Sequence, residues 1–173
     1  VGPFVSLSDL PLDVGRRVQE RISGDRTRFA SGRPADYVDV RFELEDRVRD
    51  AFLARGGRPE RARPHYLTLG ACDWLLEWYP DPDVVTIDLG SVPYDLISFT
   101  YGDLFPAFRW HGQAGPDARL SNPTRGRVFL AGDLPDLIAL HGLPQRANPS
   151  GRLGPLRYVE AQLWSDAPIA RLR

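Results

Sequence analysis

Glu160 is the carboxylate of this chain with the most unusual sequence setting. It lies within the apolar segment 156–164 (LRYVEAQLW), which predicts a strand. Side chains alternate between the two faces of a strand, so Glu160 shares a face with Tyr158, Gln162 and Trp164. A carboxylate among aromatic rings has a raised pKa, and it can act as a base or stabilise a cation in a cleft. The solvent-facing side of an antiparallel strand gives the same pattern, and the sequence leaves both interpretations open.

Ser98 and Thr100 form a second polar row in the segment 96–101 (LISFTY), where they alternate with Ile97, Phe99 and Tyr101. Their hydroxyl groups are candidates for hydrogen bonds to a ligand. A solvent-facing strand edge is the alternative explanation.

His65 lies in the predicted strand 63–69 (RPHYLTL) and is the histidine that we place near a cleft, with a structural role as the alternative. The other histidines, His111 and His141, are too far away in the sequence to form a local metal motif with it. The chain has no HExxH motif and a single cysteine, Cys72, which we expect to pack in the core. We therefore predict no metal site.

The chain contains no lysine, because all 22 of its Lys and Arg residues are arginines. This excludes P-loop, Schiff-base and pyridoxal-phosphate sites, each of which needs a lysine amine. The formal net charge is −1 but is unevenly distributed: residues 64–110 hold one Arg and seven acids. Arginines from the two flanking regions could meet to form an anion site, since guanidinium groups bind phosphate oxygens in pairs. Solvated charged faces explain the same distribution.

The clearest element that could position these residues is a helix from Tyr37 to Arg55. Its apolar side chains recur with helical spacing, and Gly56 and Gly57 can end it. We expect Glu45 to lie on its solvated face, paired with Arg49. Further helices are expected at 71–79 and 133–141, and a weak helical or extended segment at 13–22. Strands are expected at 3–7, 63–69, 84–89, 96–101, 127–131 and 156–164.

These elements predict a single α+β domain spanning residues 1–173, with a mixed, mostly antiparallel sheet and two or three packed helices. No apolar run approaches the length of a membrane span. The first 22 residues carry Asp9, Asp13, Arg16 and Arg17 within their apolar stretches, which is not typical of a signal peptide. We expect a bacterial-style cytoplasmic protein without a membrane partner.

The order of parts resembles the ADP-ribosyltransferase superfamily, including the DNA-modifying toxins of the DarT type. The resemblance consists of an opening strand with an L-x-x-G stretch (Leu12 to Gly15), a charged helix, a strand with Tyr66 followed by a Trp-containing segment, and a last strand with Glu160. The family carries a His or Arg on its first strand, whereas the segment 3–7 here reads PFVSL.

The resemblance implies that NAD is the co-substrate and that Glu160 and Tyr66 are catalytic. Glu160 would stabilise the oxocarbenium-like cation, and Tyr66 would stack on the nicotinamide. Arg26, Arg28 and Arg33 would pair with the pyrophosphate, and His65, Ser98, Thr100 and Gln162 would complete the cofactor site. The acceptor would be an unidentified protein or nucleic acid.

Two other classes of function fit the same residues. One is a non-catalytic binding or regulatory domain that uses the same cleft, or an exposed aromatic patch that includes Trp110. The other is a binder of a small sugar or nucleotide without transfer chemistry.

Overall fold

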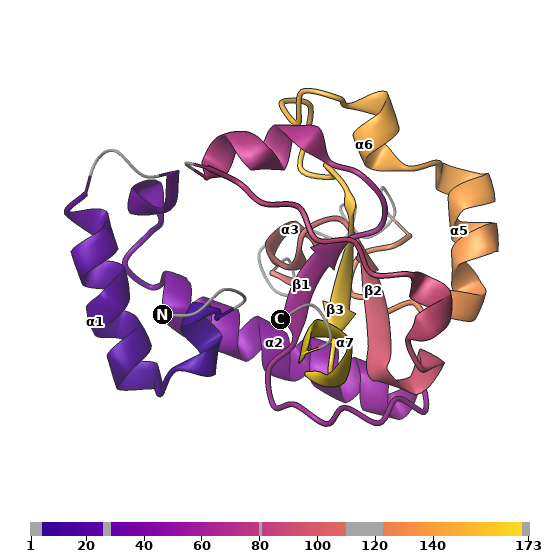
Figure 1. Ribbon diagram of the computed structural model, residues 1–173, viewed down its shortest axis with the longest axis horizontal. Coiled ribbons are helices and arrows are strands. Elements are labelled where there is room, and N and C mark those ends of the chain that lie inside the picture. Colours follow the sequence, from indigo (N-terminus) through magenta and orange to yellow (C-terminus); the bar gives the residue numbers. More distant parts are fainter. Residues whose placement is uncertain (1–4, 26–28, 80, 110–122, 171–173) are drawn as a thin grey trace.

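The computed structural model describes residues 5–25, 29–79, 81–109 and 123–170 (Figure 1). They form one α+β domain around a small antiparallel sheet. Its strands are β1 (His65–Thr68), β2 (Ile97–Tyr101) and β3 (Val159–Leu163), in the order β1-β3-β2. β3 is central and antiparallel to both neighbours. The expected mixture of parallel and antiparallel pairs is therefore wrong for the described residues, in which both strand pairings are antiparallel.

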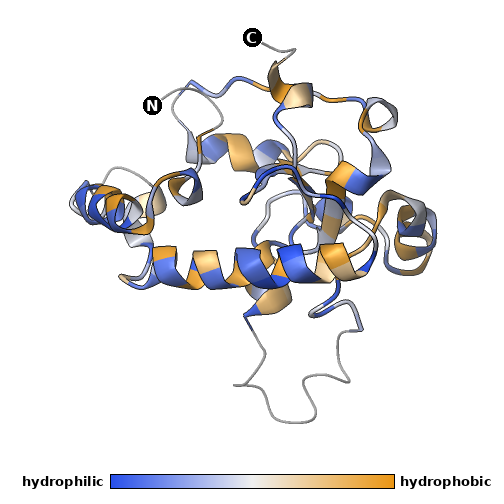
Figure 2. Ribbon diagram, turned by 90° about the horizontal axis from the view of Figure 1, so that it is seen from below, coloured by the Kyte–Doolittle hydropathy of each residue, from blue (hydrophilic) through white to orange (hydrophobic). Residues whose placement is uncertain are grey.

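Helix α2 (Tyr37–Ala54) is the longest element that packs on the sheet, and its prediction from the sequence is confirmed. Three of its buried apolar residues, Leu44, Val48 and Phe52, join Trp164, which follows β3, and the short helix α3 (Leu104–Phe108) in one apolar cluster. Gly56 ends the helix at φ +87°, and the Gly57 N–H donates to Phe52 O at 2.9 Å. In Figure 2, α2 runs across the molecule with hydrophilic and hydrophobic residues alternating along its length.

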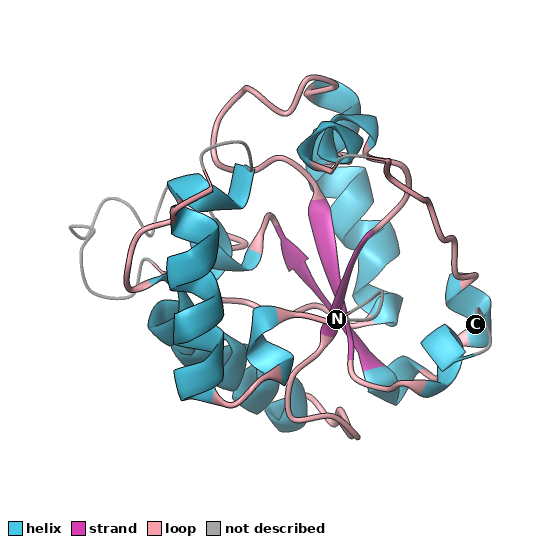
Figure 3. Cartoon of the chain, turned by 60° about the vertical axis from the view of Figure 1, so that its left-hand side comes forward, coloured by secondary structure: helices cyan, strands magenta, loops and turns pink. Residues whose placement is uncertain are grey.

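The opposite face of the sheet carries the larger apolar cluster. It contains Phe99, Val159, Ala161 and Leu163 from the strands, together with residues of α5 (Leu134–His141) and α7 (Ala167–Ala170). Helices therefore lie on both sides of the strands, as Figure 3 shows. The remaining elements of the described residues are α1 (Leu12–Ser23), α6 (Pro144–Ala147), and six short 3-10 helices, η1 (Leu7–Asp9), η2 (Phe29–Gly32), η3 (Asp73–Trp78), η4 (Leu89–Ser91), η5 (Tyr94–Leu96) and η6 (Ala131–Asp133).

Two expected strands are wrong. The segment 84–89 forms no strand, and its apolar residues diverge: Val84 is 68% exposed, whereas Ile87 and Leu89 pack against the larger cluster. In the segment 3–7, of which Pro3 and Phe4 lie outside the described residues, Ser6 instead caps η1, which begins at Leu7. The Ser6 and Asp9 side chains form a capping box there, and this favours a helical turn over extended backbone.

Two other predictions are confirmed only in part. The segment 71–79 is helical, but as the 3-10 helix η3. The segment 127–131 contributes only one isolated bridge to the sheet, from Phe129 to Phe99. No helix among the described residues combines the length and the apolar character needed to cross a membrane.

Candidate functional site

The structure brings five of the predicted site residues together on one face of the sheet. Across the strands, Tyr66 and Ser98 lie opposite Gln162, and Thr68 and Thr100 lie opposite Glu160. Paired residues point to the same side of a sheet. We call this group, Tyr66, Ser98, Thr100, Glu160 and Gln162, the polar sheet face.

The polar sheet face is enclosed. Ser98, Thr100 and Gln162 are 0% exposed and Glu160 is 4% exposed. Trp164 continues the same face and packs against α2 and α3, which explains the lack of solvent contact. The interpretation of this face as the wet side of an antiparallel strand is therefore wrong.

A continuous set of hydrogen bonds satisfies these buried groups. The Trp164 Nε1–H donates to Ser98 Oγ at 2.9 Å, and the Ser98 hydroxyl donates to Gln162 Oε1 at 3.0 Å. The Gln162 amide then donates to Thr100 Oγ1 at 2.9 Å and to Glu160 Oε1 at 3.1 Å. Each donor has an acceptor inside the protein, so burial of these groups carries little free-energy penalty.

The second oxygen of Glu160 belongs to a group of three. The Tyr158 hydroxyl lies 3.4 Å from Glu160 Oε2 and 3.1 Å from Asp103 Oδ2. A single phenolic proton cannot serve both carboxylates. Burial, and next the charge of Asp103, raise the pKa of Glu160 well above its usual value. A protonated Glu160 that donates to Tyr158, which in turn donates to Asp103, gives all three groups a partner.

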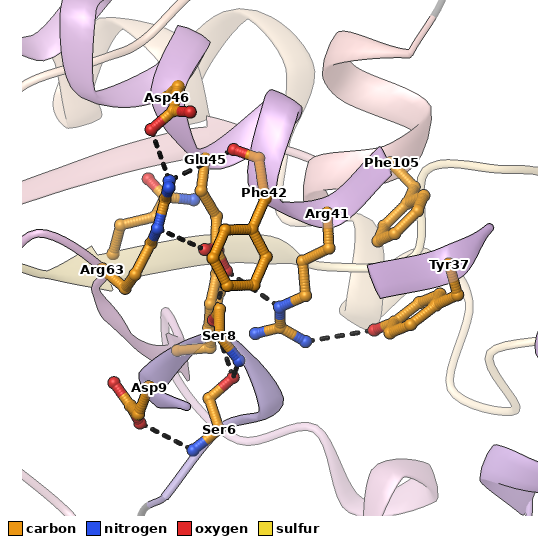
Figure 4. A network of polar contacts seen from close by, with 12 residues as sticks. Ser6, Ser8, Asp9, Tyr37, Arg41, Phe42, Glu45, Asp46, Arg63 and Phe105 are labelled. Atoms are coloured by element: carbon orange, nitrogen blue, oxygen red, sulfur yellow. Dashed lines mark hydrogen bonds and ion pairs between the residues drawn. The ribbon is translucent and has the colours of Figure 1, made fainter. Parts of the chain in front are cut away.

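A second buried acid, Glu45 on α2, lies next to this face and was not expected there (Figure 4). It is 0% exposed, and its Oε1 atom accepts from three donors: Ser8 Oγ at 2.8 Å, Arg41 Nε at 2.8 Å and Tyr66 OH at 2.7 Å. Arg63 Nε lies 3.6 Å from the other oxygen. The Arg41 guanidinium also stacks over the Tyr66 ring, 4.6 Å from its centroid.

The expected pairing of Glu45 with Arg49 is wrong, because Glu45 turns inward to Arg41, the residue four positions before it. The sequence contained one indication. Glu45 directly follows the buried Leu44 and precedes the buried Val48 by three positions, which places it at the border of the apolar stripe.

The remaining predicted site residues lie elsewhere. His65 lies opposite Leu163, and its Nε2 atom is 2.7 Å from Asp166 Oδ1. The Arg33 guanidinium stacks on Tyr37, 4.4 Å from the ring centroid. Arg26 and Arg28, like Trp110, lie outside the described residues. Among the described arginines, Arg41 is the one whose positive charge acts on both Tyr66 and Glu160.

Neither of two hollows of about 300 and 400 Å³ on the described surface is lined by the polar sheet face. The first lies between the end of α2 and η6, lined by residues 55–57, 94–95, 130 and 132–133, and the second by residues 90–94. The described residues contain no group of three or more His, Cys, Asp or Glu side chains placed to hold a metal ion.

Comparison with family models, curated proteins and solved structures finds no match for this chain. The function must therefore be argued from the residues themselves.

Proposed function

We propose that this chain is a non-catalytic binding domain that takes a basic segment of a partner protein on the surface formed by Tyr79 and residues 81–88. We call this the acidic surface. Its exposed acids are Asp81, Asp83 and Asp88, and its exposed large apolar residues are Tyr79, Val84 and Val85. The observation that carries the proposal is this combination of exposed apolar side chains and unpaired acids.

The apolar exposure is high for a water-facing segment. Tyr79 is 62% exposed, Val84 68% and Val85 37%. Single exposed apolar residues are ordinary, but several within one short stretch are typical of an interaction site. The backbone of residues 82–88 forms no strand, while Ile87 and Leu89 hold the segment on the core. The outward side chains are therefore presented on an anchored segment.

The charge of this surface favours a cationic partner. No arginine occurs between Arg63 and Arg109, although the chain has 22. Asp95, outside this surface, pairs with Arg58, whereas none of the three acids of the acidic surface forms an ion pair with a described residue. Unpaired acids repel one another, and a cationic segment relieves that repulsion while it accelerates association.

Binding of a basic peptide tests the proposal. The probe is a synthetic amphipathic peptide of alternating Arg and Leu, with a Glu/Leu peptide as its counterpart, measured by calorimetry. We expect the Arg peptide alone to bind, and its Kd to rise with salt. Asp81→Asn with Asp83→Asn should weaken binding several-fold, whereas Asp50→Asn with Asp136→Asn, two exposed acids elsewhere, should not. Equal Kd values for both double variants would contradict the proposal.

ADP-ribosyl transfer from NAD is the second candidate function. The observation that favours it is the meeting of Tyr66, Glu160 and Gln162 on one sheet face, with the positive charge of Arg41 nearby. It requires the enclosed face to open, since a catalytic carboxylate must touch the ribose. Tyr66, which would stack on nicotinamide, is covered by Arg41 instead. Transfer of label from NAD to a lysate, abolished by Glu160→Gln, would establish this function in place of the first.

A further inference from the structure

Residues 5–25, which we call the N-terminal arm, lie outside both apolar clusters of the described residues. They contain η1 and α1. In Figure 1, α1 lies at one side of the molecule, away from the sheet, and in Figure 2 it carries both hydrophilic and hydrophobic residues. Its apolar residues Leu12, Val14, Val18 and Ile22 are only half-buried. Elements with few buried apolar contacts open at a lower free energy than the core does.

Polar contacts also attach the arm to the body. The Ser8 hydroxyl donates to Glu45 Oε1 at 2.8 Å, and the Asp9 carboxylate pairs with Arg61. On the outside, Arg16 Nε donates to Asp39 Oδ1 at 3.0 Å, with both side chains at least 41% exposed. Exposed ion pairs of this kind contribute little and are screened by salt.

Close packing of the arm occurs at Gly15. A Cβ atom there would lie 3.1 Å from Leu7 O and 3.3 Å from Val38 Cγ1, so glycine lets α1 approach α2 closely. This contact fixes where the arm rests, but it buries no large apolar side chain of the arm.

The surface beneath η1 is already organised. Arg41 and Tyr66 bind Glu45 independently of Ser8's contact, and Arg63 is held by Phe42 O at 3.1 Å and by Asp46 (Figure 4). Glu45 Oε2 is buried and has no hydrogen bond among the described residues, so this acid keeps unused acceptor capacity. The surface would thus offer an acceptor for a hydroxyl group and, in Arg61, a donor for a carboxylate.

We infer that the N-terminal arm opens as a unit, and that the uncovered surface binds the same arm of a second copy of the chain. The arm carries the two groups that this surface needs, the Ser8 hydroxyl followed by the Asp9 carboxylate. If two copies exchange their arms, each arm therefore makes the same contacts with the other copy that it makes within its own. The inference does not depend on the acidic surface.

Hydrogen exchange of the full chain tests the opening. Ser8→Ala with Asp9→Asn should raise the exchange rate of the α1 amides about tenfold or more and leave β3 unchanged. Asp13→Asn, which breaks the Asp13–Arg17 pair within α1, is the matched control and should leave the rate unchanged. The wild-type chain in 1 M NaCl should show the same selective increase in exchange of the α1 amides. This second measurement tests the opening even if the double variant does not fold. Equal protection of α1 and β3 under all conditions would overturn the inference.

A peptide added in trans tests the exchange. The eight-residue peptide of residues 5–12 (VSLSDLPL) should bind the Ser8→Ala, Asp9→Asn chain, while the peptide with the same two substitutions should bind at least tenfold more weakly. If both peptides bind equally, or neither binds while α1 exchanges freely, the uncovered surface is not the complement of the arm. A basic peptide that binds the acidic surface leaves this result unaffected, so the two proposals fail separately.

Discussion

The side-chain amide of Gln162 lies 3.1 Å from Glu160 Oε1, two residues away on the same face of β3. Side chains two positions apart on a strand point to the same side of the sheet. Both of these side chains are buried, so the Gln162 amide donates to the Glu160 carboxyl group at a place that water does not reach. This relationship explains how an acid at 4% exposure is tolerated in the centre of a sheet. It also accounts for the closed state of the polar sheet face.

The buried Glu160 makes stability depend on pH. Its pKa is raised in the folded chain, chiefly by burial, so above the unfolded value near 4.5 the folded state binds more protons than the unfolded state. The free energy of unfolding then falls as pH rises toward the folded pKa, by at most about 1.4 kcal/mol per pH unit. Glu160→Gln removes this titration and keeps a neutral group of similar shape.

We therefore expect Glu160→Gln to gain stability relative to the wild-type chain between pH 5 and pH 8, as measured by urea denaturation. Glu160→Ala, which leaves Gln162 without an acceptor, should be less stable at every pH. A wild-type chain whose stability rises relative to Glu160→Gln over this range would show that Glu160 is charged in the folded state.

Tyr66→Phe tests the contact between the sheet and Glu45. The substitution removes one of three donors to a fully buried carboxylate oxygen, and we expect a loss of about 1–2 kcal/mol in the free energy of unfolding. Tyr79→Phe is the matched control, because Tyr79 is 62% exposed, and should change stability by less than about 0.5 kcal/mol. A similar loss in both variants would remove Tyr66 from the network.

Gly151 tests the packing of Trp74 beneath the segment that leads to β3. Gly151 and Gly154 have nearly the same positive φ, 64° and 63°, but a Cβ on Gly151 would lie 2.3 Å from the Trp74 ring, whereas Gly154 faces open space. Both alanine variants carry the backbone penalty, about 1 kcal/mol. Gly151→Ala should be less stable than Gly154→Ala by a further 1–3 kcal/mol or so, measured by thermal or urea unfolding. Equal losses would place Trp74 elsewhere.

Cys72 should react slowly with thiol reagents. It is partly exposed, which corrects its expected place in the core, but burial of the thiol and the nearby charge of Asp73 raise its pKa to about 11. The thiolate is the reactive form, so alkylation by iodoacetamide at pH 8 should be on the order of 100-fold slower than that of a free cysteine peptide. The rate should continue to rise above pH 10. A plateau below pH 9 would contradict this pKa.

The sequence was sufficient where a local pattern and the tertiary structure agree. The helix over Tyr37–Ala54 and the strands β2 and β3 follow from apolar periodicity, and so does the common face of Glu160 and Gln162. The enclosure of that face did not follow. Alternation gives two unlike faces, but it does not say whether water or another polar layer covers the second one.

The wrong predictions share one cause, because each depends on contacts between residues far apart in the sequence. Val84 and Val85 have high β propensity, yet propensity does not supply a partner strand, and Ile87 anchors the segment instead. Glu45 meets Ser8 across 37 residues and Tyr66 across 21, and a helical pattern cannot indicate such contacts. The exposure of the acidic surface could not be predicted either, because it depends on which segments pair as strands.

The most direct test of the account compares the Kd of the Arg/Leu peptide for Glu160→Gln with that for the Asp81→Asn, Asp83→Asn chain. If the function lies on the acidic surface and Glu160 is a closed, neutral part of the core, Glu160→Gln binds like the wild-type chain and the double variant binds several-fold more weakly. Loss of binding in Glu160→Gln, with the double variant unchanged, would contradict the account and place the function at the polar sheet face.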